Sequence, residues 1–504
     1  MSHTHIIDPL NRVEGDLAIE LSVGDNNIIE DAKCLGFVYR GFENIFIGRK
    51  PFDAMRMSQR SCGVCPVSHG TAGAVAIESL VGNFKIPRNA QLIRDIVLGS
   101  NTIVSHATHF YFMWGPDLVS EAYKDKKLYS EIVKRFEPLN MGHLREILLN
   151  ARVPLHSVVA IFGGKFPHPS HAVPGGVCCV PKHIEIIKVN TILSKVAEYI
   201  TKDILNGVTV EEWLKIKSVA DVLKLMKDER FANSDIGLFI KYAQDIGLHK
   251  FGEKTPNNFL AYGFGHNKDG SWLFKPGYSE NGKFHELDPK HIFEDTTFSY
   301  YETEHDWRNP AEGITKVVPK KQGAYTWIKA PRYFGHVVEA GPLARQIVNG
   351  DPLIIDLVKT FGINTFTRTL ARLHECLVIM PKLIEWVDEI DISKPFYEPF
   401  PEIKNGKGYG LVEAPRGALG HWIEVENGVC KRYQIITPTT WNCSPIDSKG
   451  QKGAVEQALI GIKLKDKDSI LEAGHIVRSF DPCISCSIHA VGKNKKSIFI
   501  EHMH

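Results

Sequence analysis

Two short cysteine motifs, one near each end of the 504-residue chain, constrain its fold more than any other feature. Both motifs read CxxC followed by a histidine, as "RSCGVCPVSH" and "DPCISCSIH". They supply Cys62, Cys65 and His69 from the first motif and Cys483, Cys486 and His489 from the second. Two CxxC pairs make a four-thiolate set that suits zinc, an iron–sulfur group or another thiophilic metal. A single site built from both pairs forms only after nearly all of the intervening chain has folded.

The separation of the two pairs weighs against an ordinary zinc ribbon. Ribbon pairs lie about 15–20 residues apart, whereas most of the chain separates these two. A chain of this length with 43% hydrophobic residues buries a large core and does not need a metal staple. An active centre between distant segments is therefore favoured, and a structural zinc site and a redox dithiol stay open as alternatives. We interpret the remaining cysteines as small buried residues: Cys34, Cys178, Cys179, Cys376, Cys430 and Cys443.

Composition excludes several classes of function. The net charge of +2 gives no electrostatic footprint for nucleic acid, so we expect no such partner. We find no run of about 18 apolar residues and expect no membrane span. The N-terminal "MSHTHIIDPLNRVEG" lacks the basic and apolar regions of a secretory signal. If the protein is exported, another chain must carry it.

Hydropathy patterns predict one large mixed unit. Residues 16–37 alternate apolar and polar positions around a "GDNN" turn, which is typical of a hairpin. The last hundred residues alternate again, and we expect strands from both ends to meet in one layer. Residues 258–330, rich in Gly, Tyr, Trp and Asn, favour hairpins. Helical periodicity appears at 86–114, 141–151, 181–204, 209–228 and 341–392.

The sequence resembles the large subunit of [NiFe] hydrogenases over almost all of residues 5–489. The resemblance is carried by motifs in the order of that family: "IDPLNRVEGD", "YRGFENI", "DAMRMSQRSCGVCPVSH", "GGKFPHPSHAVPGGV", "YTWIKAPRY", "EAGPLAR", "EAPRGALGHW", "TPTTWNCSPID" and "DPCISCSIH". It implies a mixed α+β fold, predominantly helical, with a central bundle of long helices and peripheral antiparallel sheets. It also implies reversible heterolytic cleavage of dihydrogen into protons and electrons.

The resemblance assigns the four thiolates to a nickel–iron centre. Cys65 and Cys486 would bridge nickel to an iron that carries carbon monoxide and cyanide ligands, and Cys62 and Cys483 would be terminal on nickel. Soft thiolates donate strongly to nickel, and one of them can accept a proton when dihydrogen is split. His69 would lie near a bridging thiolate without binding the metals.

Further residues take catalytic roles by the same resemblance. Arg416, in "APRGALGHW", would lie over the metals with its fixed charge, and Asp117 and Asp481 would orient it. Glu14, in "NRVEGD", would relay protons from the terminal cysteine. The family usually has histidine where this chain has Asp16, so the proton path beyond Glu14 is left open.

Two smaller groups complete the expected site. Pro438 and Thr439, in "TPTTWN", would face a cyanide ligand. Glu43, the backbone carbonyl of Ile435 and His489 would hold a hard cation, usually magnesium, which prefers oxygen ligands.

The resemblance also implies how the chain is matured. The catalytic unit would be residues 1–489, with the metals between segments 62–69 and 483–489. Residues 490–504, "AVGKNKKSIFIEHMH", would be an extension removed by a maturation endopeptidase after nickel-insertion factors have loaded the site.

Electrons must leave through another polypeptide, because this chain has no cysteine set for cubane clusters and no GxGxxG fingerprint. The resemblance implies an iron–sulfur small subunit facing His168. It also implies an uptake-type enzyme that is membrane-associated through its partners, a cytochrome b among them, and exported with the small subunit. Two rivals remain: a quinone-reductase relative, disfavoured because all four cysteines are present, and a zinc-stapled structural subunit.

Overall fold

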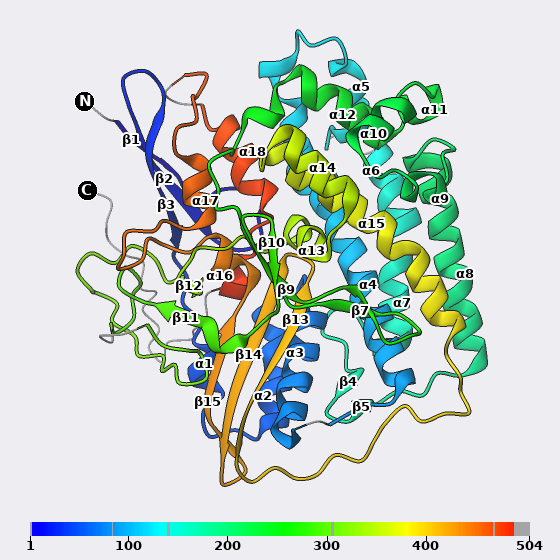
Figure 1. Cartoon of the computed structure of the whole chain (residues 1–504), viewed down its shortest axis with the longest axis vertical. Helices are drawn as coiled ribbons and strands as arrows, with labels where there is room; N and C mark the ends of the chain where they lie inside the picture. Colours follow the sequence, from blue (N-terminus) through cyan, green and yellow to red (C-terminus); the bar gives the residue numbers. More distant parts are fainter. Residues whose placement is uncertain (1–2, 83, 139–141, 304–306, 467–468, 488–504) are drawn as a thin grey trace.

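The computed structural model describes residues 3–82, 84–138, 142–303, 307–466 and 469–487. Figure 1 shows a bundle of helices along one side of the molecule and antiparallel sheets along the other. Helices contain more residues than strands do. The predicted fold class, a predominantly helical α+β fold with peripheral antiparallel sheets, is therefore confirmed.

Two long helices form the centre of the bundle. Helix α4 (Arg88–Thr108) packs against α15 (Thr365–Asp388), and α7 (Val153–Gly163) and α8 (His183–Tyr199) flank this pair. Pro87 is the N-cap of α4, and the side chain of Asn364 caps α15 by accepting a hydrogen bond from the Thr367 amide. The start of each helix is therefore set by a single residue, Pro87 for α4 and Asn364 for α15.

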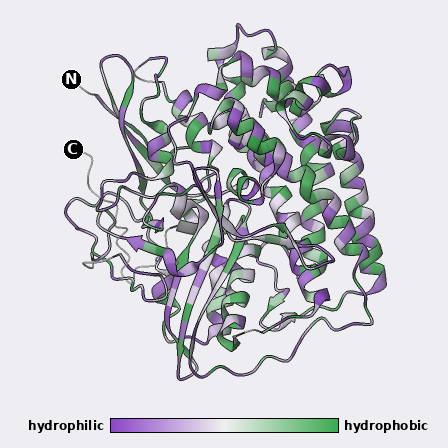
Figure 2. Cartoon of the chain, in the orientation of Figure 1, coloured by the Kyte–Doolittle hydropathy of each residue, from purple (hydrophilic) through white to green (hydrophobic). Residues whose placement is uncertain are grey.

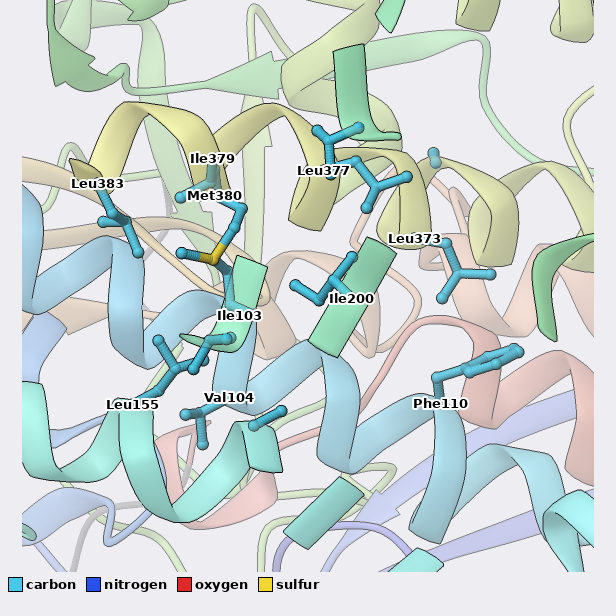
Figure 3. Close-up of a cluster of buried hydrophobic side chains, with 14 of the residues drawn as sticks. Ile103, Val104, Phe110, Leu155, Ile200, Leu373, Leu377, Ile379, Met380 and Leu383 are labelled. Atoms are coloured by element: carbon cyan, nitrogen blue, oxygen red, sulfur yellow. The ribbon is translucent and has the colours of Figure 1, made fainter. Parts of the chain in front are cut away.

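Apolar side chains from these helices point toward one another (Figure 3). Ile103 of α4, Leu155 of α7 and Leu383 of α15 are all buried. A Cβ atom at Gly99 of α4 would lie 2.8 Å from Leu383 Cδ2. The absence of a side chain at Gly99 therefore lets α4 and α15 approach closely. Figure 2 shows apolar and polar residues alternating along the bundle helices, as expected for helices with one buried face.

Every predicted helical segment contains helices, but many other helices lie outside these segments. Segment 141–151 contains α6 and η6, 181–204 contains α8 and η7, 209–228 contains α9 and α10, and 341–392 contains α13, α14 and α15. The α-helices not yet given bounds are α1 (Phe42–Ile45), α2 (Pro51–Ser58), α3 (Pro66–Glu78), α5 (Tyr129–Phe136), α6 (Gly142–Ile147), α9 (Val210–Leu214), α10 (Val219–Leu225), α11 (Glu229–Ala232), α12 (Asp235–Asp245), α13 (Pro342–Asn349), α14 (Pro352–Phe361), α16 (Pro438–Asn442), α17 (Ala454–Leu459), α18 (Leu471–Ser479) and α19 (Ile484–Ser487).

Shorter helical segments connect these helices. They are η1 (Gln59–Ser61), η2 (Ser79–Val81), η3 (His109–Trp114), η4 (Gly115–Val119), η5 (Glu121–Tyr123), η6 (Leu148–Arg152), η7 (Ile200–Ile204), η8 (Leu248–Lys250) and η9 (Pro289–His291). Segment η3 continues α4, so the predicted helix over 86–114 is confirmed almost to its end.

The two main sheets are separate three-stranded antiparallel sheets. One contains β1 (His3–Ile7), β2 (Leu17–Val23) and β3 (Ile29–Gly36). The other contains β13 (Gly406–Ala414), β14 (Gly417–Glu426) and β15 (Val429–Ile436), and α3 packs against it. The prediction that strands from both ends share one layer is therefore wrong. The two ends meet through isolated bridges instead, one of which pairs Glu14 with Cys483.

The smaller strands are β4 (Ala172–Val173), β5 (Gly176–Val177), β6 (Asn258–Ala261), β7 (Phe264–His266), β8 (Trp272–Phe274), β9 (Gly277–Glu280), β10 (Lys283–His285), β11 (Ile292–Asp295) and β12 (Ala330–Tyr333). They form one further three-stranded sheet, in the order β10-β9-β6, and three two-stranded sheets, β4-β5, β7-β8 and β11-β12. The hairpin prediction over 258–330 is thus confirmed up to residue 295. The described parts of 296–329 form only isolated bridges.

Among the residues that the structure describes, one helical stretch is long and apolar enough to cross a membrane by length and composition alone. It runs over Gly142–Gly163, and 39% of its most apolar window is buried. Polar residues such as Arg145, Asn150 and Arg152 interrupt this stretch, so it contains no continuous apolar run. Its C-terminal part, α7, packs on α4 and α8 within the bundle.

The close contact between α4 and α15 predicts that Leu383→Ala will strongly destabilise the chain. Removing a fully buried leucine leaves a cavity that the bundle cannot close, which costs about 2–5 kcal/mol. Leu223→Ala is the matched control, because Leu223 of α10 is 62% exposed and its truncation should cost no more than about 0.5 kcal/mol. Calorimetric melting of the two purified variants checks this. Equal shifts would contradict the packing described.

Candidate metal centre

The first two thiols lie at the start of a helix. Cys62 follows η1, and Cys65 is the N-cap of α3, with Pro66 at the first helical position. The Val64 and Cys65 amides donate hydrogen bonds to Cys62 Sγ, at 3.3 and 3.2 Å. Amide donors and the positive end of a helix stabilise a thiolate. The CxxC turn therefore prepares both sulfur atoms for metal binding.

The third thiol is held by two other segments. The Cys483 amide donates to Thr439 Oγ1 at 2.8 Å. The Glu14 amide donates to the Pro482 carbonyl at 3.2 Å, and the Ile484 amide donates to the Glu14 carbonyl at 2.6 Å. These two bonds form the parallel bridge between residues 14 and 483. The N-terminal segment therefore fixes the position of the C-terminal thiol.

Three of the four predicted thiols converge. The sulfur atoms of Cys62, Cys65 and Cys483 all lie within 4.8 Å of one another, and all three residues are buried. Cys62 Sγ and Cys483 Sγ are 3.4 Å apart. Cys486 belongs to the short helix α19, but its side chain and the whole of His489 lie outside the described residues. Buried soft donors at this spacing fit a thiophilic metal, and nickel is one such metal.

Arg416 lies beside these thiols. Its Nε donates to the Asp481 carbonyl at 3.0 Å, and its Nη2 is 3.0 Å from Asp481 Oδ1. Burial alone would lower the pKa of Arg416, but Asp481 and the three cysteines raise it well above its usual range. Arg416 therefore keeps its charge. Its Nη1 has no hydrogen-bond partner among the described residues and is available for a ligand at the centre.

A small buried cavity connects the predicted residues. It is lined by Cys65, His69, Ala414, Arg416, Leu419, Pro438, Thr439 and Cys483. Pro438 and Thr439 begin α16, whose capping box is formed by Thr437 and Thr440. The cap fixes this helix so that its first residues face the thiols. The structure thus brings together predicted site residues from four separate motifs.

His69 is buried as a neutral imidazole. Burial lowers its pKa to about 4. Its Nδ1 is 3.0 Å from His421 Nε2, and His421 Nδ1 is 2.8 Å from Tyr433 Oη. His69 Nε2 has no partner within the part of the chain that the structure describes. The imidazole is therefore oriented by hydrogen bonds from β14 and β15 and presents its other nitrogen to the cavity.

Asp117 does not orient Arg416, and that prediction is wrong. Its carboxylate is 2.6 Å from Arg478 Nη1 and also binds Arg12. The reason is its position in η4, beyond the end of α4, where it faces α18 rather than the thiols. Arg478 also donates through Nε to the Asn11 carbonyl at 2.9 Å. Asp117 therefore anchors the N-terminal segment next to Glu14.

Glu14 is half-buried between the thiols and the surface. Burial raises its pKa, the Cys62 thiol raises it further, and Arg416 and Arg40 oppose both effects. Asp16, two residues further on, is exposed. A carboxyl group with a raised pKa beside a thiol can exchange protons with it.

Arg40 is a site residue that was not predicted from the sequence. Its Nη2 donates to the carbonyls of both Ser61 and Ser485, the residues directly before Cys62 and Cys486. One guanidinium thus joins the two cysteine loops. Arg40 lies in the "YRGFENI" motif, which was the only signal that could have identified it.

The predicted hard-cation site contains an unpredicted lysine. Glu43 Oε1 accepts a hydrogen bond from the Ile435 amide at 2.9 Å. Lys329 Nζ lies 3.2 Å from Glu43 Oε2, 3.5 Å from Glu294 Oε2 and 2.7 Å from Gln434 Oε1. Burial raises the pKa of Glu294 to about 7, and its Oε1 has no partner among the described residues. This oxygen-rich set, with an unsatisfied carboxylate oxygen, fits a hard cation.

Comparisons with known proteins agree with this geometry. The family model described as nickel-dependent hydrogenase matches residues 40–135 and 139–489. The chain is 32% identical to the periplasmic [NiFeSe] hydrogenase large subunit of Desulfomicrobium baculatum, over 96% of this chain and 94% of that protein. It is 29% identical to the quinone-reactive Ni/Fe-hydrogenase large chain of Wolinella succinogenes, over 97% and 96%.

A solved structure is similar over nearly the same range. The Ni-Fe-Se hydrogenase of Desulfovibrio vulgaris Hildenborough superimposes with a TM-score of 0.83 at 30% identity, covering 97% of this chain and 100% of that one. The sequence match, the fold and the converging thiols point to the same assignment. The chain belongs to the nickel-dependent hydrogenase family, as a large, catalytic subunit.

Proposed function

We propose that this chain cleaves dihydrogen heterolytically, releasing two protons and two electrons, at a nickel–iron centre held by Cys62, Cys65, Cys483 and Cys486. The observation that carries the proposal is the convergence of three buried thiols within 4.8 Å, beside the charged Arg416. When bound, the metals supply a redox-active Lewis acid that polarises dihydrogen and takes up its electrons. The chain supplies the soft donors, the fixed charge and the proton acceptors.

Each residue then has a defined task. Arg416, held by Asp481, keeps one guanidinium nitrogen directed at the cavity, where it stabilises developing charge. The Cys483 sulfur accepts the first proton, and Glu14, joined to Cys483 through the backbone bridge, takes it onward. Pro438 and Thr439 would face a cyanide ligand of the iron. His69 supports a bridging thiolate from behind.

A magnesium ion is proposed at Glu43. Its further ligands would be the Ile435 carbonyl and His489, with Glu294 and Gln434 close by. The buried oxygen atoms around Lys329 support a cation at this position.

The partner chain is a small subunit, as the large-subunit relatives imply, and we propose that it carries iron–sulfur clusters. The loop containing His168 is a suitable contact surface, since Gly164, Lys165 and Pro167 are exposed. The charge of Cys62 affects the pKa of His168, so this loop lies near the thiols. The relative named quinone-reactive supports membrane association through partners. We propose that these partners include a cytochrome b and that the chain is exported with the small subunit.

We also propose that residues 1–489 form the mature unit. The family match ends at residue 489, which supports removal of 490–504 by a maturation endopeptidase once nickel-insertion factors have acted.

The first prediction concerns metal retention. In the enzyme purified with its small subunit, we expect about one nickel ion per large chain, together with dihydrogen oxidation. Cys483→Ala should abolish both, because a terminal donor is lost. Cys430→Ala should preserve both, because Cys430 is a buried thiol on β15, away from the cluster. Metal analysis decides the result, and zinc without nickel would favour the structural alternative.

The second prediction concerns the proton relay. Glu14→Gln removes the proton acceptor while keeping the shape of the side chain, and should lower the turnover of dihydrogen oxidation about 10²–10⁴-fold without loss of nickel. Asp16→Asn is the matched control, since the same change two residues further on affects an exposed carboxylate. Turnover is measured with an artificial electron acceptor. Equal turnover in both variants would reject Glu14 as the relay.

The third prediction concerns processing. Intact-mass measurement of the large chain from active enzyme should give a chain that ends at His489. The chain from cells grown without nickel should retain residues 490–504. A full-length chain in the active enzyme would refute the proposed removal.

A further inference from the structure

We propose that Arg345 is a positioning residue of the metal centre, which fixes the hairpin tip that carries Arg416. The proposal rests on the role of Arg416 given above. Ala414 pairs with Gly417 across β13 and β14, so Pro415 and Arg416 form a two-residue turn. Hairpin tips are usually the least restrained part of a sheet. Arg416 can keep its position beside the thiols only if this turn is held in place.

All five N–H groups of the Arg345 guanidinium have acceptors. Nε and Nη2 donate to the two oxygens of Glu375, at 3.0 and 2.5 Å. Nη1 donates to Glu413 Oε2 at 2.6 Å and to the Ala414 carbonyl at 2.9 Å. Nη2 also donates to the Pro415 carbonyl at 2.9 Å. The last two acceptors are the carbonyl groups directly before Arg416.

Helix α13 contacts the tip at a second point. A Cβ atom at Gly417, whose φ is 125°, would lie 2.5 Å from the amide nitrogen of Gly341, the N-cap of α13. The start of this helix therefore lies against one side of the turn, while Arg345, one turn into α13, binds the other. The tip cannot shift without moving α13.

The same guanidinium connects the tip to the helical bundle. Burial alone would raise the pKa of Glu375, but Arg345 and His106 lower it to about 2, so Glu375 is ionised. His106 Nε2 of α4 lies 2.9 Å from Glu375 Oε1 of α15. Arg345, buried and fully paired, thus ties Arg416 to the two central helices.

Arg345→Lys tests this arrangement in the complete enzyme with its small subunit. Lysine keeps the charge but has a single nitrogen, so it cannot reach two carboxylates and two carbonyls at once. We expect nickel content to be retained, amide hydrogen exchange over residues 411–420 to increase, and turnover to fall about 10–100-fold. The KM for dihydrogen should change less than about two-fold, because the tip acts on the reacting centre and not on gas entry.

Arg94→Lys is the matched control. Arg94 is also buried and binds both oxygens of Glu78 and the carbonyls of Val173 and Gly176, but Glu78 lies at the far end of α3 from Cys65. This variant should leave exchange over 411–420 and turnover unchanged. An equal loss of turnover in Arg94→Lys would mean that any buried arginine has this effect, and would overturn the proposal.

A double-mutant cycle with Arg416→Lys separates the two roles. If Arg345 acts through Arg416, adding Arg345→Lys to Arg416→Lys should lower turnover by less than about two-fold. Multiplying losses would overturn the positioning role. Unchanged turnover in Arg416→Lys alone would reject Arg416 itself, which is a failure of the proposed function. Should Arg345→Lys not fold, Glu375→Gln, which weakens the hold on Arg345, should give the same increase in exchange and a smaller loss of turnover, and unchanged exchange would reject the proposal.

Discussion

The structure depends on one join between the two ends of the chain, the parallel backbone bridge between Glu14 and Cys483. Arg478 strengthens it by donating to the Asn11 carbonyl and side chain while pairing with Asp117. These bonds come from the polypeptide alone. The thiol geometry is therefore a property of the entire fold, since the bundle and both main sheets must be in place before Cys483 reaches Cys62.

Around this join the protein buries ionised groups. Moving each ion out of water costs several kcal/mol, and removing one partner of a buried pair is strongly destabilising. Arg345 and Glu375 meet this cost with a complete set of hydrogen bonds. Arg372 does not: burial, Arg416 and Arg345 lower its pKa to about 10, and its Nε and Nη1 have no partners among the described residues. The network therefore fixes geometry around the thiols more than it adds to stability.

The sequence predicts the parts of this arrangement that are encoded locally. Periodicity located α4, α8 and α15, and the "GDNN" turn located the β2–β3 hairpin, because each depends on neighbouring residues. The thiols were found because CxxC is a short motif. Asp117 was assigned to the wrong arginine because its partner Arg478 is 361 residues away, and nothing near Asp117 indicates which cation the fold brings to it. The same reason explains why the N-terminal and C-terminal strands were wrongly predicted to share one sheet. Alternating apolar and polar residues indicate a strand but do not indicate which strand pairs with it.

Lys329 illustrates why buried charges are hardest to predict and how the hard-cation site can work. A lysine in "YTWIKAPRY" has no local feature that marks it as buried between Glu43 and Glu294. The ammonium pairs with Glu43, while burial raises the pKa of Glu294 to about 7, so Glu294 is only partly ionised at neutral pH. A divalent ion at Glu43 would repel the ammonium, and Glu294 Oε1, which has no partner in the described chain, is an acceptor toward which Lys329 can shift. Lys329 would thus compensate the charge of Glu43 in the absence of a divalent ion. When such an ion is bound, Lys329 would stay in the site by pairing with Glu294.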